Sequence, residues 1–164
     1  MRVGILTISD RSATGEREDE SGPLLAEMAQ SEGWTVIETS VIPDEAGQIS
    51  RQLSQWSDSG NIDLILTTGG TGFAARDVTP EATQKVVDRL APGLAEAMRA
   101  HSLRKTSHAM LSRAVAGVRG STLIVNLPGS PKGARENLEV ILPVLPHAVQ
   151  VLGGAPGAEE GHSV

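Results

Sequence analysis

The sequence contains no cysteine among its 164 residues. This absence excludes disulfide bonds, thiolate zinc sites and cysteine nucleophiles. Aromatic residues are scarce, with one Phe, two Trp and no Tyr, so the side chains on which nucleic-acid bases stack are few. The formal net charge is −6, and no cluster of Lys and Arg occurs. Since a nucleic-acid binder usually presents a basic face, we expect no nucleic-acid partner.

Long apolar runs are also missing. No run reaches the roughly 20 residues that a membrane-spanning helix needs, and the apolar segment from Val3 to Ile8 is too short for the core of a signal peptide. We therefore expect a cytoplasmic protein with no membrane partner. Hydrophobic residues make up 39% of the chain and charged residues 21%, which is typical of a globular domain.

Short apolar segments alternate with amphipathic ones along the chain. Runs rich in β-branched residues predict strands over 3–8, 34–42, 62–67, 114–118 and 122–127. Helical spacing predicts helices whose inward residues are Leu24, Leu25 and Met28; Ile49, Leu53 and Trp56; Ala82, Val86 and Leu90; Leu94, Ala97, Met98 and His101; Leu138, Ile141 and Leu142; and Leu145, Val149 and Leu152. Thr79 is expected to cap the third of these helices, with Pro80 in its first turn.

This alternation predicts an α/β fold: a doubly wound, mostly parallel sheet with helices on both faces. The short join at 119–121 implies one antiparallel pair, which makes the sheet mixed. We expect a single domain over residues 1–152. The tail at 153–164 is rich in Gly, Ala and Glu, and we expect it to be disordered.

The unusual loops all follow predicted strands. They begin at Ser9, at Asp44, at Gly69 and at Pro128. In open α/β sheets ligands bind in the crevice beyond the carboxyl ends of the strands. We therefore expect these four loops to meet at one edge of the sheet and to form the binding site.

The segment from Gly69 to Gly72 could form an anion-binding nest, because glycines allow successive backbone N–H groups to point inward and Thr71 adds a hydroxyl. It lacks the lysine of a phosphate-binding P-loop. A tight turn with no ligand is the alternative. The chain has 18 glycines, and a glycine cluster alone does not separate the two interpretations.

Two aspartates lie beside these loops. Asp77 stands between the glycines and a helix start, where a carboxylate suits magnesium or a polar ligand. Its alternative is a local bond to the backbone or an ion pair with Arg76. Asp44 lies where a helix N-cap is expected, and capping is the simpler interpretation of that residue alone.

Ser130 and Arg113 each have both a functional and a structural interpretation, whereas the histidines have only a structural one. Ser130 begins a helix, whose N-terminus favours an anion, but an ordinary cap has the same appearance. Arg113 could clamp a phosphate or pair with a surface carboxylate. The four histidines show no metal-ligand spacing, and His101 is expected to pack in the core.

Taken together, these residues resemble the family of molybdopterin-binding proteins that includes bacterial molybdopterin adenylyltransferase. The resemblance covers about residues 2 to 152. It is specific because six short segments occur in the family's order and spacing: Ile8 to Arg11, Ile42 to Glu45, Leu66 to Gly72, Arg76 to Ala82, Leu111 to Arg113 and Asn126 to Pro131.

The resemblance implies Mg²⁺-dependent transfer of AMP from ATP to molybdopterin in molybdenum-cofactor biosynthesis, with release of pyrophosphate. It also implies a homotrimer and contacts with other cofactor-assembly proteins. Two aspartates needed for activity fall on Asp44 and Asp77, which are also the implied magnesium ligands. ATP and its phosphates are expected near Ser9, Asp10, Gly69, Gly70, Thr71 and Gly72. Molybdopterin is expected near Ser102, Ser112, Arg113, Asn126, Pro128, Gly129 and Ser130.

This chain departs from the family in one place, because Phe73, Ala74 and Ala75 follow Gly72 where proline is common. Three alternatives remain at this point. One is a molybdopterin-binding paralogue without adenylyl transfer, and another is a nucleotide hydrolase related to the competence-damage domain. The third, the molybdenum-inserting enzyme, needs additional domains.

Overall fold

The computed structural model describes residues 1–154, so most of the expected disordered tail lies outside the described residues. Its sheet has six strands in the order β2-β1-β3-β6-β5-β4. Neighbours among β2, β1, β3 and β6 are parallel, while β5 and β4 are antiparallel to their neighbours. The strands are β1 (Arg2–Ile8), β2 (Thr35–Ile42), β3 (Leu64–Thr68), β4 (Arg89–Leu90), β5 (Ala116–Arg119) and β6 (Thr122–Leu127). The predicted mixed, mostly parallel sheet is confirmed.

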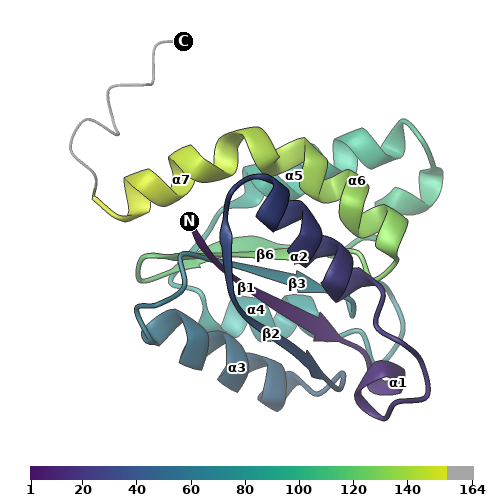
Figure 1. The fold of residues 1–164 in the computed structure, drawn as a ribbon. Helices are drawn as coiled ribbons and strands as arrows, with labels where there is room; N and C mark the ends of the chain where they lie inside the picture. The colour runs from purple at the N-terminus through teal and green to yellow at the C-terminus, as the bar shows by residue number, and fades with distance from the viewer. Residues whose placement is uncertain (155–164) are drawn as a thin grey trace.

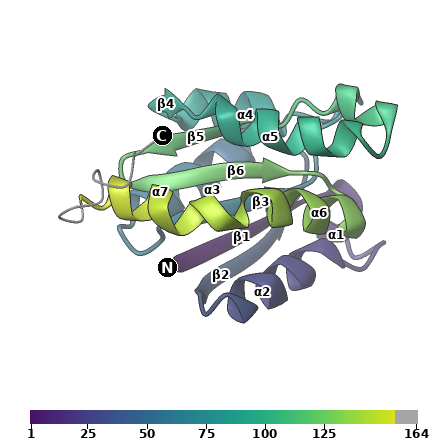
Figure 2. The ribbon, with the colours of Figure 1, turned by 90° about the horizontal axis from the view of Figure 1, so that it is seen from above.

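Helices cover both faces of the sheet (Figures 1 and 2). One face is covered by α2 (Ser21–Ser31), α5 (Pro92–Leu103), α6 (Pro131–Ile141) and α7 (Leu145–Leu152). The other face is covered by α3 (Ala46–Asp58) and α4 (Thr79–Val86). Three short helices complete the described chain: α1 (Asp10–Ala13), η1 (Ser107–Leu111) and η2 (Leu142–Val144).

Each face of the sheet has its own hydrophobic core, because alternate strand residues point to opposite faces. Leu64 and Leu66 pack toward α2 and α6, whereas Ile65 packs toward α3 and α4. All five residues of β3 are buried, as expected for a central parallel strand. The predicted inward residues Ile49, Leu53 and Trp56 are 0, 0 and 3% exposed, which confirms the apolar face of α3.

Several predicted details are wrong. Leu90 is 58% exposed, because α4 ends at Val86 and the chain turns into the edge strand β4. Thr79 is the first residue of α4 rather than its cap. Ala97 is exposed, and His101 is only half-buried on α5, where its Nδ1 lies 2.9 Å from the Arg104 guanidinium. His101 is therefore partly exposed and does not belong to the core.

The parallel strands β1, β2, β3 and β6 all end at one edge of the sheet, which we call the carboxyl edge. The loops after these strands and the short helix α1 lie there (Figure 2). The opposite edge, the amino edge, carries Arg2 and the β5–β6 turn. No helix within residues 1–154 is long and apolar enough to cross a membrane.

Candidate functional site

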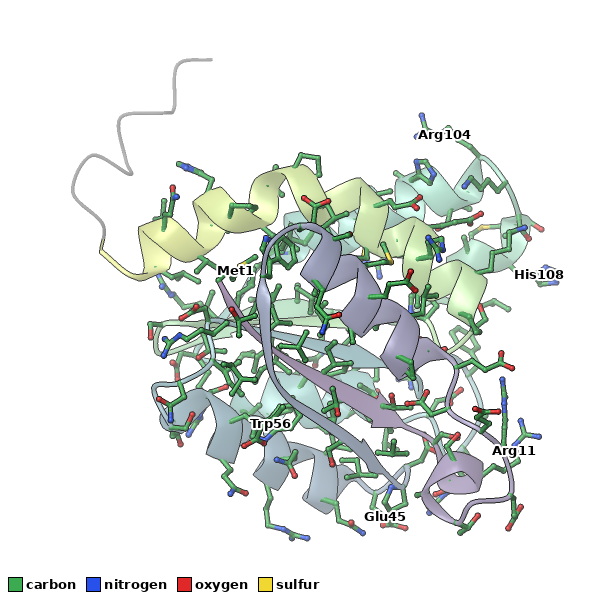
Figure 3. The ribbon with its side chains drawn as sticks, viewed as in Figure 1. Met1, Arg11, Glu45, Trp56, Arg104 and His108 are labelled. Carbon is green, nitrogen blue, oxygen red and sulfur yellow. The ribbon has the colours of Figure 1, made fainter. Side chains whose placement is uncertain are left out.

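A cavity of about 440 Å³ opens at the carboxyl edge. Its lining comes from the loops after β1, β2, β3 and β6, including Ser9, Asp10, Asp44, Gly69, Gly70, Asp77, Gly129 and Ser130. The expected convergence of the four loops is thus confirmed. Figure 3 shows Arg11, which lines this cavity, and Glu45 on the same side of the molecule, away from Met1. We call this space the first cavity.

The loops after β1 and β2 are joined by a reciprocal pair of hydrogen bonds. The backbone N–H of Asp10 donates to the Asp44 carboxylate at 2.8 Å, and the backbone N–H of Asp44 donates to the Asp10 carboxylate at 3.0 Å. Asp44 is therefore not the cap of α3, whose N-cap is Glu45. The capping alternative for Asp44 is wrong, and its side chain lines the first cavity instead.

The carbonyl groups of the glycine loop are bound by two residues, Thr79 and Arg113. The carbonyls of Gly69 and Gly70 accept hydrogen bonds from the side chain and backbone of Thr79, at 2.9 and 3.1 Å. The carbonyls of Thr71 and Gly72 accept hydrogen bonds from the backbone and side chain of Arg113. In a trans peptide the next N–H points opposite to the carbonyl. The N–H groups that follow these carbonyls therefore point away from Thr79 and Arg113, and the anion nest stays a prediction.

Glycine is required in this loop for two reasons. Gly69 and Gly70 have φ angles of 104° and 63°, which side chains rarely tolerate. The two carboxylates also approach the loop closely. A Cβ atom on Gly70 would lie 3.0 Å from Asp44 Oδ1, and one on Gly72 would lie 2.8 Å from Asp77 Oδ2. The glycines thus let Asp44 and Asp77 lie against the loop two residues apart.

The electrostatic environment of Asp44 differs from that of Asp10. Burial raises the pKa of Asp44, and the charges of Asp10 and Asp77 add to the rise. The hydrogen bonds from Arg76 lower the pKa of Asp10. Asp77 accepts a hydrogen bond from the Ala74 backbone N–H at 2.9 Å, which is the local bonding expected of a loop aspartate. Arg76 pairs with Asp10 and Glu45 instead of Asp77.

A second cavity of about 330 Å³ lies beside the first, and Ser130 lines both. It is enclosed by the glycine loop, the end of α5, the η1 region and the start of α6, which supply Thr71, Gly72, Ser102, Ser112, Pro128, Ser130 and Asn137. Ser130 also caps α6 by accepting a hydrogen bond from the Gly133 N–H at 3.1 Å. Its cap role is confirmed, and its shared position connects the two cavities.

The predicted residues divide between the two cavities. Those expected near ATP lie in the first cavity, except Thr71 and Gly72, which line the second. Of those expected near molybdopterin, Ser102, Ser112, Pro128 and Ser130 line the second cavity, while Gly129 lines the first.

Arg113 and Asn126 line neither cavity. Arg113 binds the carbonyls of Gly72 and Asp77 and pairs with Glu81, so it holds the glycine loop in place. Asn126 is 0% exposed. Its amide group donates to the hydroxyls of Thr67 and Thr83 at 3.0 and 2.9 Å. Arg113 and Asn126 thus hold neighbouring parts of the chain in place and do not line the cavities themselves.

Several cavity residues were missed by sequence reasoning. Arg11, Arg17 and Asp19 line the first cavity, and Arg99 and Lys105 line the second. Asp19 accepts hydrogen bonds from Thr7 and from the first N–H groups of α2. Its position just before a helix was the available signal, because aspartate is favoured there. No local pattern distinguishes the four basic residues from other surface charges.

The donor set at Asp44 and Asp77 fits magnesium only in part. No group of three or more His, Cys, Asp or Glu residues able to hold a metal occurs within residues 1–154. Mg²⁺ is usually bound by one or two carboxylates together with waters and substrate phosphates. Asp44 and Asp77 supply two such carboxylates, and the other ligands of a magnesium ion would have to come from waters and a substrate.

Comparisons with known proteins show the family to which the chain belongs. Residues 4–147 match the family described as "Probable molybdopterin binding domain". This chain belongs to the molybdopterin-binding domain family. The molybdopterin biosynthesis enzyme MoaB from Thermus thermophilus has a similar structure, with a TM-score of 0.89 and 55% identity over 94% of this chain and 98% of that one.

Members of this family occur both alone and within longer proteins. The chain is 42% identical to molybdopterin adenylyltransferase of Helicobacter pylori over 156 residues, which covers 94% of this chain and 89% of that protein. It is 46% identical to gephyrin of Dictyostelium discoideum over 164 residues. That match covers 94% of this chain but only 23% of gephyrin, so the chain spans about a quarter of this longer relative.

Proposed function

We propose that the protein transfers AMP from ATP to molybdopterin and releases pyrophosphate, as a step of molybdenum-cofactor biosynthesis. The observation that carries this proposal is the pair of adjoining cavities that share Ser130. The lining of the first includes Asp44, Asp77, Gly69 and Gly70, which suit a metal-bound triphosphate. The second offers a separate place for the pterin, and homologues named molybdopterin adenylyltransferase support the assignment.

The reaction joins two anionic groups. The terminal phosphate oxygen of molybdopterin attacks the α-phosphorus of ATP, the bond from that phosphorus to the bridging oxygen of the β-phosphate breaks, and pyrophosphate leaves. The attacking oxygen is already ionised at neutral pH, so a strong general base is not needed. Catalysis of such transfers consists mainly of alignment and charge stabilisation.

The residues around the first cavity have separate roles in this alignment and charge stabilisation. The N–H groups after the bound carbonyls of Gly69 to Gly72 hold phosphate oxygens. Asp44 and Asp77 would hold Mg²⁺, which would supply positive charge to the phosphates. The N-terminus of α6 at Ser130 faces the junction of the cavities, where it favours the phosphate of the pterin.

A molybdopterin-binding protein without transfer activity is the second candidate, because it needs only the second cavity. The intact pair of Asp44 and Asp77 in the first cavity favours the enzyme. The hydrolase alternative is less favoured, since the segment from Arg76 to Pro80 resembles the molybdopterin branch of the fold.

We also propose that the protein acts as a homotrimer that contacts other cofactor-assembly proteins. An apolar depression lined by Ala91, Leu94, Ala97, Val140 and Val144 lies between α5 and α6. Val144 in this depression is 50% exposed, and Leu90, which precedes Ala91 in the chain, is 58% exposed, which suits burial between subunits. Sedimentation analysis should give three times the mass of the chain, and a monomer at micromolar concentration would contradict the trimer.

A single-turnover assay tests the activity. Purified protein in excess over molybdopterin is mixed with ATP and Mg²⁺, and adenylylated molybdopterin and pyrophosphate are followed together. Equal amounts of both products are expected. Binding of molybdopterin without either product would make the protein a binding paralogue, and release of phosphate or pyrophosphate without adenylylated pterin would indicate a hydrolase.

A further inference from the structure

Arg76 is a charged residue of the carboxyl edge that the proposed reaction does not use. Its side chain binds two carboxylates at once. Nε and Nη2 donate to the two oxygens of Asp10 at 3.0 and 2.9 Å, and Nη1 lies 2.9 Å from Glu45 Oε1. One guanidinium therefore connects the loop after β3 to the loops after β1 and β2.

These contacts connect Arg76 to both proposed metal ligands. Asp10 is joined to Asp44 by the reciprocal backbone hydrogen bonds. Asp77 follows Arg76 directly in the chain, so the two Cα atoms are only about 3.8 Å apart. Arg76 therefore links the loop that carries Asp77 to the loops that carry Asp10 and Asp44.

Arg76 also divides the carboxylates of this edge into two kinds. Asp10 and Glu45 are paired with its guanidinium. Within residues 1–154, no ion pair engages Asp44 or Asp77. Of the four carboxylates on the loops after β1, β2 and β3, Arg76 thus pairs with two and leaves Asp44 and Asp77 for an incoming cation. The other acidic residues of the first cavity, Glu18, Asp19 and Glu20, lie on the segment before α2.

We propose that Arg76 is a positioning residue that reserves Asp44 and Asp77 for the divalent cation by occupying Asp10 and Glu45. The inference rests on the proposed function, because it takes Asp44 and Asp77 as the metal ligands. Without Arg76, Asp10 becomes a competing ligand beside Asp44, and a cation is drawn away from the position that activity requires.

Loss of Arg76 should not unfold the protein. The side chains of Arg76, Asp10 and Glu45 are 55, 41 and 50% exposed, and ion pairs between exposed groups contribute little to stability. A matched control is Arg119, which forms a bidentate pair with Asp58 at the amino edge, with both distances 2.9 Å. Arg119→Ala removes the same kind of pair far from the cavities.

The experiment compares wild type, Arg76→Ala, Arg76→Ala with Asp10→Asn, and Arg119→Ala. Two quantities are measured: the affinity for Mn²⁺ alone, by paramagnetic resonance, and the turnover number with molybdopterin, ATP and Mg²⁺. Arg76→Ala should bind Mn²⁺ several-fold more tightly than wild type, because two carboxylates lose their counter-charge. Its turnover should still fall by roughly 10- to 100-fold, because the cation is misplaced.

Asp10→Asn in the Arg76→Ala background provides the decisive comparison. Asparagine keeps an oxygen that accepts the Asp44 N–H but removes the competing charge. Mn²⁺ affinity should return toward the wild-type value, and part of the turnover should be recovered. A loss of the loop's structure alone would lower Mn²⁺ affinity and would not be rescued by this second change.

Three outcomes would overturn the proposal: turnover of Arg76→Ala within twofold of wild type, weaker Mn²⁺ binding without rescue by Asp10→Asn, or no Mn²⁺ binding by any of the four proteins. Failure of the proposed function gives a different result. In that case wild type forms no adenylylated product, yet the order of Mn²⁺ affinities among the four proteins still tests the role of Arg76.

Discussion

The pKa values of aspartates at the two edges of the sheet are shifted by different causes. At the amino edge, Asp63 is paired with Arg2 and Asp58 with Arg119, and hydrogen bonds from these arginines lower the pKa of both aspartates. At the carboxyl edge, hydrogen bonds from Arg76 lower the pKa of Asp10 in the same way, but burial raises the pKa of Asp44, and neighbouring negative charges add to this rise.

The glycines at the two edges also have different surroundings. At the carboxyl edge the loop with Gly70 and Gly72 is held by hydrogen bonds from Thr79 and Arg113 and lies against two carboxylates. At the amino edge Gly120 also has a positive φ angle, but it lies in a two-residue turn between β5 and β6, and a Cβ atom there would meet nothing within 4 Å. Unfavourable local arrangements that persist in a fold are typical of functional sites. The comparison indicates that the amino edge stabilises the domain, whereas the carboxyl edge is arranged for a ligand.

The largest expected effect follows removal of the carboxyl-edge charges. Asp44→Asn and Asp77→Asn should each lower the turnover number by at least roughly 10²–10³-fold, because comparable electrostatic groups contribute this much in other enzymes. Asp58→Asn, at the other edge, is the control and should keep full activity. Single-turnover rates measure the effect, and near-normal turnover of Asp77→Asn would refute the metal-ligand role.

A methyl group in the glycine loop should have the next largest effect. Gly72→Ala places a Cβ atom 2.8 Å from the Asp77 carboxylate, which has to shift. A displacement of about 1 Å can lower a rate by roughly 10²-fold, and we expect a loss of this order with little change in Tm. Gly47→Ala on α3 is the matched control, since its nearest neighbour would be 3.6 Å away. Equal turnover in both variants would contradict the close-approach argument.

Asn126 should affect stability and leave ligand binding unchanged. Asn126 is fully buried. Asn126→Leu removes the amide group that donates hydrogen bonds to the hydroxyls of Thr67 and Thr83. An unsatisfied buried polar group costs about 1–3 kcal/mol. Urea unfolding measures this loss, and molybdopterin affinity is measured alongside it. A large loss of affinity at unchanged stability would restore the role in binding that the sequence predicted.

The smallest expected effects are changes in Tm, which should have opposite signs for aspartate substitutions at the two edges. Burial disfavours the Asp44 carboxylate in the folded state, so Asp44→Asn should raise Tm at pH 7. For Asp58 the folded-state pKa is lowered by Arg119, so Asp58→Asn should lower Tm slightly at pH 7. Both differences should shrink as the pH falls below about 4, where aspartate becomes protonated in the unfolded chain. Shifts of the same sign in both variants would contradict the contrast between the edges.

Most of the fold could be predicted from the sequence because periodic apolar residues determine it. The alternation of strands and helices, the buried β3 and the apolar face of α3 all follow from such patterns. The wrong prediction for Leu90 has a physical reason. The helical spacing of apolar residues continues in the sequence beyond Val86, but the chain there leaves α4 and forms β4, the outermost strand of the sheet. Local spacing does not reveal a tertiary contact of this kind.

The convergence of the four loops could be predicted from the sequence, but the presence of two separate cavities could not. Strand ends predicted the convergence of four loops, because parallel strands bring their carboxyl ends to one edge. The separation into two cavities depends on α5 and η1, which enclose the second one. Arg113 and Asn126 lie in motif segments yet line neither cavity, because their hydrogen bonds to Gly72, Thr67 and Thr83 involve residues far along the chain.

The most direct test of the account is a crystal structure with Mg²⁺ and α,β-methylene-ATP, an analogue whose α–β bond does not break. The account predicts the triphosphate in the first cavity against Gly69 and Gly70, with the metal between it and the carboxylates of Asp44 and Asp77. The second cavity should remain open for molybdopterin. A nucleotide in the second cavity, or a metal held by Asp10 and Glu45 instead, would contradict the account.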